Sequence, residues 1–219
     1  MSPKGEGSEK VESGKLVERL YRQAKESSKE GGLQGAVEAY RELLAIDPKH
    51  LKARNNLGVL YDQLGNYEEA LAQYQAAEEL DPDDVRLQCN IAAVLASLAR
   101  YSEAEAKLRQ ALHADPKNPD ARENLGLLQF KKGLYAEAAE ELRRAAELDP
   151  TRATAYLYLG EALNRLDKVD EALAAFEKSV EIRPDNPRAF YKMGIVFDRK
   201  HQPDVAKDMY RRAEELGGW

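Results

Sequence analysis

Apolar residues recur along this chain at intervals of three and four positions, the spacing that places them on one face of an α-helix. From Val17 onward the apolar stretches come in pairs, and turn-forming residues such as Gly65-Asn66 and Gly133 separate the two members of a pair. An Asp-Pro or Arg-Pro step ends each of the first five pairs, because proline lacks an N–H group and disfavours helical geometry in the preceding residue. The pattern predicts a succession of helix-turn-helix units.

The helix pairs recur every 34 residues without insertion or deletion, so the chain holds six copies of one unit. The copies span residues 17–50, 51–84, 85–118, 119–152, 153–186 and 187–219. In each copy we expect a first helix near positions 2–14 and a second helix near positions 18–31. Val, Ile and Thr are too scarce for a sheet protein, so the pattern predicts an all-α fold.

Small residues stand at fixed positions in every copy. Position 8 is always Ala or Gly and position 20 is always Ala, as Gly58 and Ala70 illustrate in the second copy. A larger side chain at these positions would hold two crossing helices apart, and protein interiors are packed too tightly to absorb the difference. We therefore interpret positions 8 and 20 as the points where the two helices of a unit cross.

This arrangement resembles the tetratricopeptide repeat family, whose unit is a 34-residue helix-turn-helix motif. The resemblance covers residues 17–219 and implies a right-handed superhelical solenoid of six units, which we place at residues 16–219 as one domain. Residues 1–15 are rich in Gly, Ser, Lys and Glu, and we expect them to form a disordered tail. A pentatricopeptide array that reads RNA has a similar unit size, but its basic balance and repeat signature are missing.

Charge argues against nucleic acid as a partner. The formal net charge is −6 and the isoelectric point about 5.3, so the chain has no global field that attracts phosphate backbones. No apolar run is long enough for a signal peptide or a membrane span, so we expect no membrane insertion and a cytoplasmic location. A periplasmic protein whose signal has been removed would have the same features, so that location stays open.

Candidate catalytic and metal-binding residues do not converge. His50, His113 and His201 fall at positions 34, 29 and 15 of different copies, a spacing that forms no metal site. We interpret all three as surface or turn residues. Cys89 is the single cysteine, and we interpret it as a small apolar residue of the family's groove. The sequence predicts no enzyme activity, no cofactor and no metal.

Functional residues are implied by the resemblance to the family. Its first helices line a concave groove through positions 2, 5, 6, 9, 12 and 13, and extended peptides lie along that groove. At these positions this chain has ten cations, among them Lys52, Arg86, Lys131, Arg165, Arg188 and Lys192, and six anions. The balance favours an extended acidic segment as the ligand. The alternative is that acidic residues populate the rest of the surface for solubility alone.

Position 6 carries an asparagine in three consecutive copies, Asn56, Asn90 and Asn124. A carboxamide offers a donor and an acceptor, so a ladder of such residues can hold a peptide backbone whatever its side chains are. The ladder resembles that of the repeat domain of O-GlcNAc transferases, with which Asn56-Leu57-Gly58 and Asn124-Leu125-Gly126 agree. Tyr158 and Lys192 depart from the pattern and limit the ladder to the middle copies. We add Asn55, the neighbour of Asn56, to the predicted peptide-binding residues.

The sequence thus predicts a non-enzymatic scaffold that binds an extended, acidic segment of a partner protein in its concave groove. The alternative is an assembly protein whose partner is a second copy of itself or a secretion or pilus apparatus. That protein would use the convex face or the ends of the solenoid.

Overall fold

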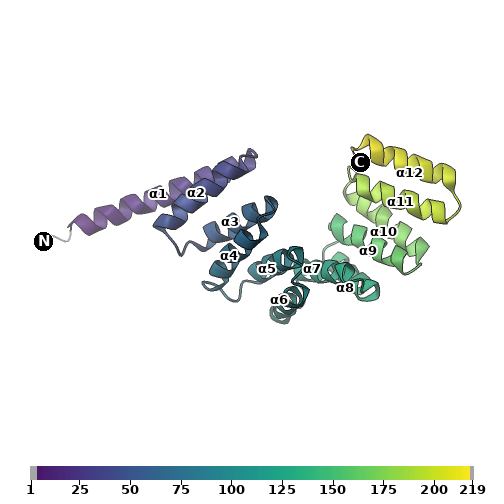
Figure 1. Cartoon of the computed structure of the whole chain (residues 1–219), viewed down its shortest axis with the longest axis horizontal. Helices are drawn as coiled ribbons and strands as arrows, with labels where there is room; N and C mark the ends of the chain where they lie inside the picture. Colours follow the sequence, from purple (N-terminus) through teal and green to yellow (C-terminus); the bar gives the residue numbers. More distant parts are fainter. Residues whose placement is uncertain (1–3, 218–219) are drawn as a thin grey trace. The chain divides into compact units, whose positions relative to one another are not determined.

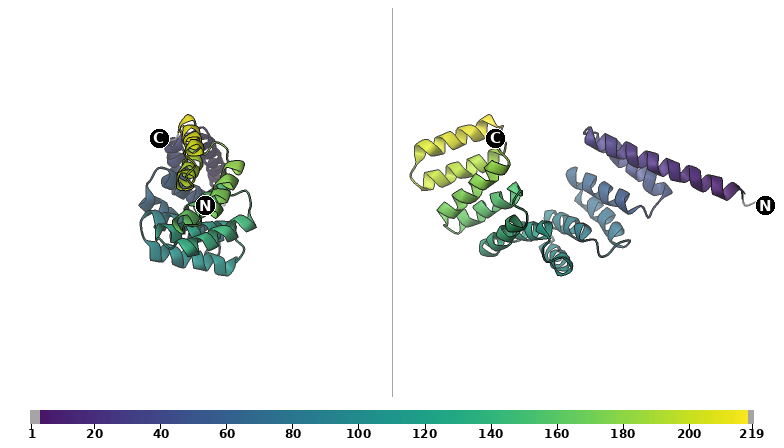
Figure 2. Two further views of the ribbon diagram at one scale, coloured as in Figure 1. Left: turned by 90° about the vertical axis from the view of Figure 1, so that its right-hand side faces the viewer. Right: turned by 180° about the vertical axis from the view of Figure 1, so that it is seen from behind.

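The computed structural model describes residues 4–217, with side chains from residue 12 onward, and in that part it contains twelve α-helices and no strand (Figures 1 and 2). The first helices of the six copies are α1 (Lys4–Lys29), α3 (Leu51–Gln63), α5 (Val85–Ser97), α7 (Pro119–Lys131), α9 (Ala153–Arg165) and α11 (Pro187–Arg199). The second helices are α2 (Leu33–Ile46), α4 (Tyr67–Glu78), α6 (Tyr101–Ala114), α8 (Tyr135–Leu148), α10 (Val169–Ile182) and α12 (Pro203–Glu215). The predicted all-α repeat of helix pairs is confirmed.

The chain divides by its contacts into two compact units, Met1–Ala104 and Glu105–Trp219, called unit 1 and unit 2 below. The repeat pattern predicted a single domain. In a solenoid each repeat packs only against its neighbours, so a division into parts leaves most contacts of each part intact. Each unit has a core of its own, with Tyr40 and Leu57 in unit 1 and Leu142 and Phe176 in unit 2.

Helix α1 begins far earlier than the sequence predicted. It runs from Lys4, so residues 4–15 are helical where we expected a disordered tail, and residues 1–3 lie outside the described residues. No proline interrupts the segment between Lys4 and Lys29. Once the packed part of a helix has formed, each added residue gains a backbone hydrogen bond without a new nucleation step. Low apolar content therefore does not end the helix.

Two of the first helices, α7 and α11, begin at Asn-Pro steps, close to the start that the repeat pattern predicts. Asn118 accepts a hydrogen bond from the Ala121 backbone N–H at 3.0 Å, and Asn186 accepts one from Ala189 at 3.4 Å. The proline that follows each asparagine occupies the first turn, where its missing N–H costs nothing. Both contacts stabilise the entry into a first helix.

The small residues at position 8 lie where predicted, directly against the large residue at position 24. A Cβ atom added to Gly58 would lie 2.6 Å from Cε1 of Tyr74, and one added to Gly160 would lie 2.6 Å from Cε1 of Phe176. Real Cβ atoms do not approach other carbons so closely, so the rings lie on bare backbone. Ala70, at position 20, is fully buried. The crossing interpretation is therefore confirmed by the packing.

Candidate functional site

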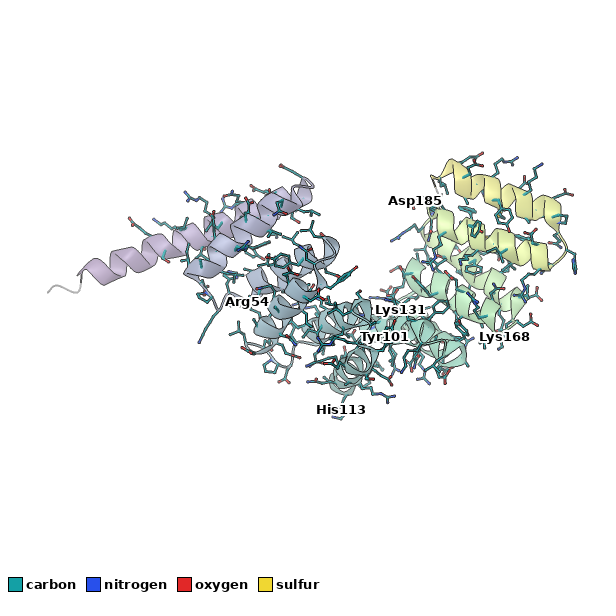
Figure 3. The ribbon with its side chains drawn as sticks, viewed as in Figure 1. Arg54, Tyr101, His113, Lys131, Lys168 and Asp185 are labelled. Atoms are coloured by element: carbon teal, nitrogen blue, oxygen red, sulfur yellow. The ribbon has the colours of Figure 1, made fainter. Side chains whose placement is uncertain are left out.

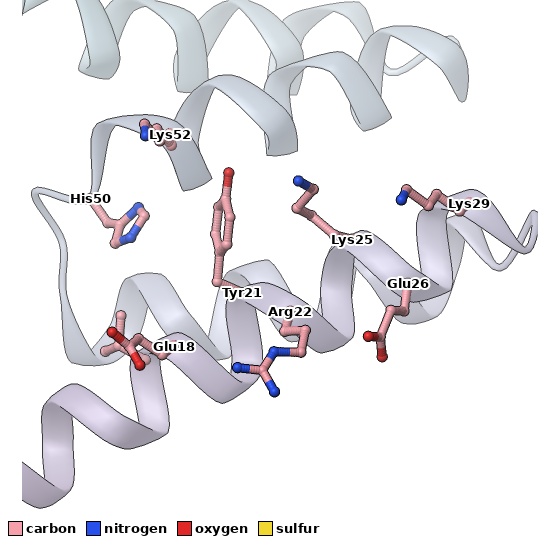
Figure 4. A pocket seen from close by; sticks show the side chains of 9 residues that line it. Glu18, Tyr21, Arg22, Lys25, Glu26, Lys29, His50 and Lys52 are labelled. Atoms are coloured by element: carbon pink, nitrogen blue, oxygen red, sulfur yellow. The ribbon is translucent and has the colours of Figure 1, made fainter.

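An open pocket lies between α1 and the beginning of α3 in unit 1 (Figure 4). It has a volume of about 610 Å³. Its lining, which we call the basic pocket, comprises Val17, Glu18, Tyr21, Arg22, Lys25, Glu26, Lys29, His50 and Lys52. Four of these residues are Lys or Arg and two are Glu, so cations predominate. Lys52, a predicted ligand-binding residue, is thereby placed beside three further cations.

A second pocket of about 210 Å³ adjoins the basic pocket and shares Lys25 and Lys29 with it. Its lining includes Asn56 of α3 and Tyr40 of α2. The structure therefore brings Asn56, the first predicted asparagine of the ladder, next to the same lysines that line the basic pocket.

Tyr21 lies at the centre of the basic pocket. Its ring packs edge-on against Tyr40, with centroids 5.8 Å apart, and lies tilted against the His50 ring at 5.3 Å. Its hydroxyl points towards α3 (Figure 4), where it accepts a hydrogen bond from Nδ2 of Asn56 at 3.2 Å. The same Nδ2 donates to the hydroxyl of Tyr40 at 2.9 Å, while burial raises the pKa of Tyr40. Asn56 thus uses its donor group to hold two tyrosine hydroxyls in place.

His50 has a structural role that the sequence reasoning missed. Its Nδ1 accepts a hydrogen bond from the Ala53 backbone N–H at 3.1 Å, which caps the N-terminus of α3. The acceptor role requires a ring nitrogen without a proton. The position of His50, immediately before the first residue of a helix, was the available signal. Capping also fixes the imidazole ring beside Tyr21.

The other predicted residues of unit 1 also make contacts within the protein. Nδ2 of Asn90 donates to Oδ1 of Asn55 at 3.2 Å, so these two asparagines link α5 to α3. Arg86 is largely exposed and pairs with the N-cap residue of its own helix, Asp84, at 3.2 Å. This pairing leaves most of the guanidinium in solvent.

In unit 2 two predicted cations converge on one carboxylate. Nη2 of Arg188 lies 2.6 Å and Nζ of Lys192 lies 3.1 Å from the carboxylate oxygens of Glu161, a residue only 8% exposed. Arg188 also donates to the Tyr158 hydroxyl at 3.0 Å, and its guanidinium carbon lies 4.7 Å from the centroid of that ring. Burial lowers the pKa of Arg188, but Glu161 and Tyr158 raise it by more.

The remaining predicted residues of unit 2 are spread over two helices. Lys131 is exposed at the last position of α7 (Figure 3), and the Arg165 guanidinium lies 5.8 Å from the ring centroid of Tyr135. Asn124 is half-buried on α7. Asn56 and Asn90 belong to unit 1 and Asn124 to unit 2, so a ladder of three asparagines stays a prediction, as does the likeness to O-GlcNAc transferases.

The charge excess of the predicted groove positions lies mainly in unit 1. There, five cations face two anions: Arg22, Lys25, Lys29, Lys52 and Arg86 against Glu18 and Asp62. In unit 2, five cations face four anions: Lys131, Arg165, Arg188, Lys192 and Arg199 against Asp120, Glu123, Glu161 and Asp198. Two of those anions, Asp120 and Glu123, pair with Arg152 at 2.7 and 2.5 Å. Counted over these positions alone, the excess of cations is three in unit 1 and one in unit 2.

A family model described as "Tetratricopeptide repeat" matches residues 21–85, 90–153 and 135–187, well over half of the chain. The chain belongs to the tetratricopeptide repeat family. Repeats of this family mediate protein–protein interactions and are generally non-enzymatic scaffolds, so the partner of this tetratricopeptide repeat protein is a protein or a peptide.

Solved structures of other tetratricopeptide repeat proteins share the fold. PilF of Pseudomonas aeruginosa has a TM-score of 0.77 at 20% identity, with 93% of each chain covered. A tetratricopeptide repeat protein from Parabacteroides merdae has a TM-score of 0.77 at 21% identity, over 92% of this chain and 78% of that one. YrrB, described as a TPR protein with an unusual peptide-binding site, has a TM-score of 0.59 at 27% identity, over 82% of this chain and 93% of its own. No curated protein sequence matches at a significant level.

Within residues 4–217, no three His, Cys, Asp or Glu side chains gather closely enough to hold a metal ion, and no helix is both long and apolar enough to cross a membrane. His113 lies near the end of α6 (Figure 3). Cys89 is 3% exposed on α5, so it packs inside the protein and not on an open groove surface.

Proposed function

We propose that this tetratricopeptide repeat protein is a scaffold that binds an extended, acidic segment of a partner protein, with the basic pocket of unit 1 as its main contact. One observation carries the proposal. Arg22, Lys25, Lys29 and Lys52 line one pocket, and none of them forms an ion pair within the described residues. Glu18 and Glu26 also line the pocket, but neither forms an ion pair within the described residues, so the lining keeps an excess of two positive charges that favours a ligand with carboxylates.

The pocket offers more than charge. The Tyr21 hydroxyl accepts its hydrogen bond from Asn56, so its own proton is available to a ligand carboxylate. Lys25 and Lys52 lie on either side of that hydroxyl (Figure 4) and would supply charge-assisted hydrogen bonds. Oδ1 of Asn56 would accept from a backbone N–H of the ligand. The peptide-binding site of YrrB supports a peptide as the class of ligand.

The proposal includes the remaining predicted residues as further contacts along the segment. In unit 1 these are Asn55, Asn90 and Arg86, and in unit 2 they are Asn124, Lys131 and Arg165, whereas the predicted Arg188 and Lys192 already pair with Glu161. Each hydrogen bond from an asparagine would contribute roughly 0.5–1.5 kcal/mol net. Replacing Asn56, Asn90 and Asn124 together by alanine would then weaken binding by more than about tenfold.

Fluorescence anisotropy with a labelled octaglutamate peptide, acetylated and amidated at its ends, tests the proposal. We expect K25A/K52A to bind the peptide at least about tenfold more weakly than the wild type, because two of the four pocket cations are gone. The matched control is K117A/K207A, which removes two exposed lysines that do not line the pocket. Equal losses in the two variants, or a wild type that binds no octaglutamate, would show that the pocket is not the site.

The alternative from the sequence, a self-assembling or secretion- or pilus-type assembly protein, is not favoured by any contact within the described residues. PilF at 20% identity shows a shared fold only. Light scattering tests this alternative, which predicts oligomers that persist in the triple asparagine variant. A monomer at all concentrations would count against it.

A further inference from the structure

Position 9 of the 34-residue copy carries opposite charges in the first and the fifth copy, which belong to unit 1 and unit 2. In the first copy it is Lys25, a cation of the basic pocket, and in the fifth copy it is Glu161. At position 2 of the copy that follows, the chain has a cation in both places, Lys52 and Arg188. Each surface therefore has a cation at position 2 of the following copy. The residue at position 9 decides whether that cation has a counter-ion, because Glu161 supplies one to Arg188 and Lys25 supplies none to Lys52.

Glu161 is placed as a bound carboxylate would be. It comes from α9 and reaches across to α11, where Arg188 and Lys192 lie 2.6 and 3.1 Å from its two oxygens. Tyr158, one turn earlier on α9, adds a hydroxyl bonded to Arg188 at 3.0 Å. A carboxylate flanked by two cations, with a tyrosine hydroxyl beside them, is the arrangement that the basic pocket would offer to a ligand through Lys25, Lys52 and Tyr21 (Figure 4).

Glu161 is only 8% exposed, so its negative charge is largely shielded from water beside these two cations. A ligand carboxylate approaching the same cations would meet the negative charge of Glu161 at close range. Like charges in a partly desolvated site repel strongly, so the α9–α11 surface disfavours acidic ligands.

We propose that Glu161 is a specificity-determining residue, an internal carboxylate that occupies the anion position of the α9–α11 surface and so directs acidic segments to the basic pocket of unit 1. The inference rests on the proposed function, because it concerns the choice between two surfaces for the same class of ligand. Arg188 and Lys192 then act as structural partners of Glu161 until that carboxylate is removed.

The first test uses the labelled octaglutamate peptide and the K25A/K52A background, in which the basic pocket no longer competes. Adding E161Q removes the negative charge while keeping the size of the side chain. We expect octaglutamate to bind K25A/K52A/E161Q at least about tenfold more tightly than K25A/K52A, and R188A to abolish that gain. The control is K25A/K52A/E181Q, which changes the net charge equally by removing the exposed partner of Lys178 and is expected to bind like K25A/K52A.

The outcomes separate the two proposals. If octaglutamate binds the wild type but E161Q adds nothing to K25A/K52A, the role of Glu161 is wrong and the basic pocket stands. If K25A/K52A binds as well as the wild type, the proposed function is wrong, whatever E161Q does. Circular dichroism of each variant shows that it is folded before its affinity is compared.

A second measurement needs no peptide. E161A opens a space between Arg188, Lys192 and Tyr158 that free acetate can enter. We expect sodium acetate to raise the melting temperature of E161A by several degrees relative to sodium chloride at equal concentration, because a ligand that binds only the folded state stabilises it. The wild type and E181A retain the same basic pocket as E161A, so they give the baseline response to acetate, which should be clearly smaller. An E161A variant that responds like the wild type would overturn the proposal.

Discussion

Single residues explain both the packing and the site of this protein. Four of the six 34-residue copies have a glycine at position 8. Because glycine has no side chain, the large residue at position 24 can lie directly on the helix backbone. The role of Asn56 depends instead on its hydrogen-bond partners, which the repeat pattern does not predict. Its amide nitrogen bonds two tyrosine hydroxyls, so it positions Tyr21 as well as facing the adjoining pocket.

Gly160→Ala tests the helix crossing at the residue scale. The new Cβ would lie 2.6 Å from the ring of Phe176, which is fully buried and cannot move aside. We expect a loss of about 1–3 kcal/mol in the free energy of unfolding, measured by urea denaturation. Gly14→Ala in α1 is the matched control, since nothing lies within 4 Å of its Cβ position. That change should be neutral or stabilising by up to about 1 kcal/mol.

Elements are joined by polar side chains that the repeat pattern did not single out. At position 4 of the second, third and fourth copies, Arg54, Gln88 and Arg122 donate to the carbonyls of Pro48, Pro82 and Pro116 at 2.8, 2.9 and 3.0 Å. Each bond fastens the turn that precedes a first helix to that same helix. The turn after each Asp-Pro step therefore has a defined path.

Arg122→Met tests how much the contacts of the position-4 side chain stabilise the fold. Besides the turn carbonyl, Arg122 pairs with Glu141 of α8 at 2.7 Å, and both side chains are less than one-fifth exposed. Removing the guanidinium leaves a largely buried carboxylate with Arg144 alone at 3.3 Å, so we expect a loss of about 1–3 kcal/mol by chemical denaturation. The double variant R122M/E141L should recover part of it. A double variant less stable than R122M would show that the ion pair is not the cause.

Glu105 provides a pH test at a contact between α6 and α7. Hydrogen bonds from Lys132 and Arg109, each at 2.7 Å, lower the pKa of Glu105. A carboxylate with a lowered pKa stabilises the folded state above its unfolded pKa of about 4.3, and this stabilisation is lost as the pH falls through and below that value. E105Q should therefore melt below the wild type at pH 7, and the gap should close towards pH 3. E147Q, an exposed carboxylate without an ion pair in the described residues, should show no such gap at either pH.

Across the whole molecule, burial is distributed unevenly among the helices. Eight residues of α9 are buried, including Leu157 and Leu163, whereas α12 buries two alanines, Ala206 and Ala213. Its positions 21 and 28, Lys207 and Glu214, are exposed and charged, whereas most earlier copies have apolar residues such as Leu71 there, with Glu105 and Glu78 as exceptions. Neighbouring repeats supply most of the stability of a solenoid, so helices with little buried surface open most readily.

Hydrogen exchange of the intact protein measures this difference. We expect the amides of α12 to exchange at least about tenfold faster than those of α9, because opening α12 exposes far less apolar surface. Uniform protection across both helices would show that unit 2 opens only as a whole. Peptides from α10 and α11 complete the comparison within the same unit.

The local fold follows from the sequence to a large extent, because it depends on properties that repeat. The 34-residue period, the small residues at position 8 and the Asn-Pro starts each predict a feature that the structure confirms. Two expectations differ: α1 extends to Lys4, since an existing helix propagates through polar residues, and the contacts divide into two units. Neither depends on a repeated position, so the period contains no signal for them.

The sequence by itself thus determined the family, the helix pairs and an excess of cations at groove positions. Only the tertiary structure decided which of those cations have counter-ions, because an ion pair depends on side chains that are brought together from different helices. Arg188 and Lys192 look equivalent to Lys52 in the sequence, yet they converge on Glu161, which lies 27 and 31 residues earlier in the chain, while Lys52 lies in an open pocket. The attraction between two charges depends on their distance in space, and the spacing of residues along the chain does not determine that distance.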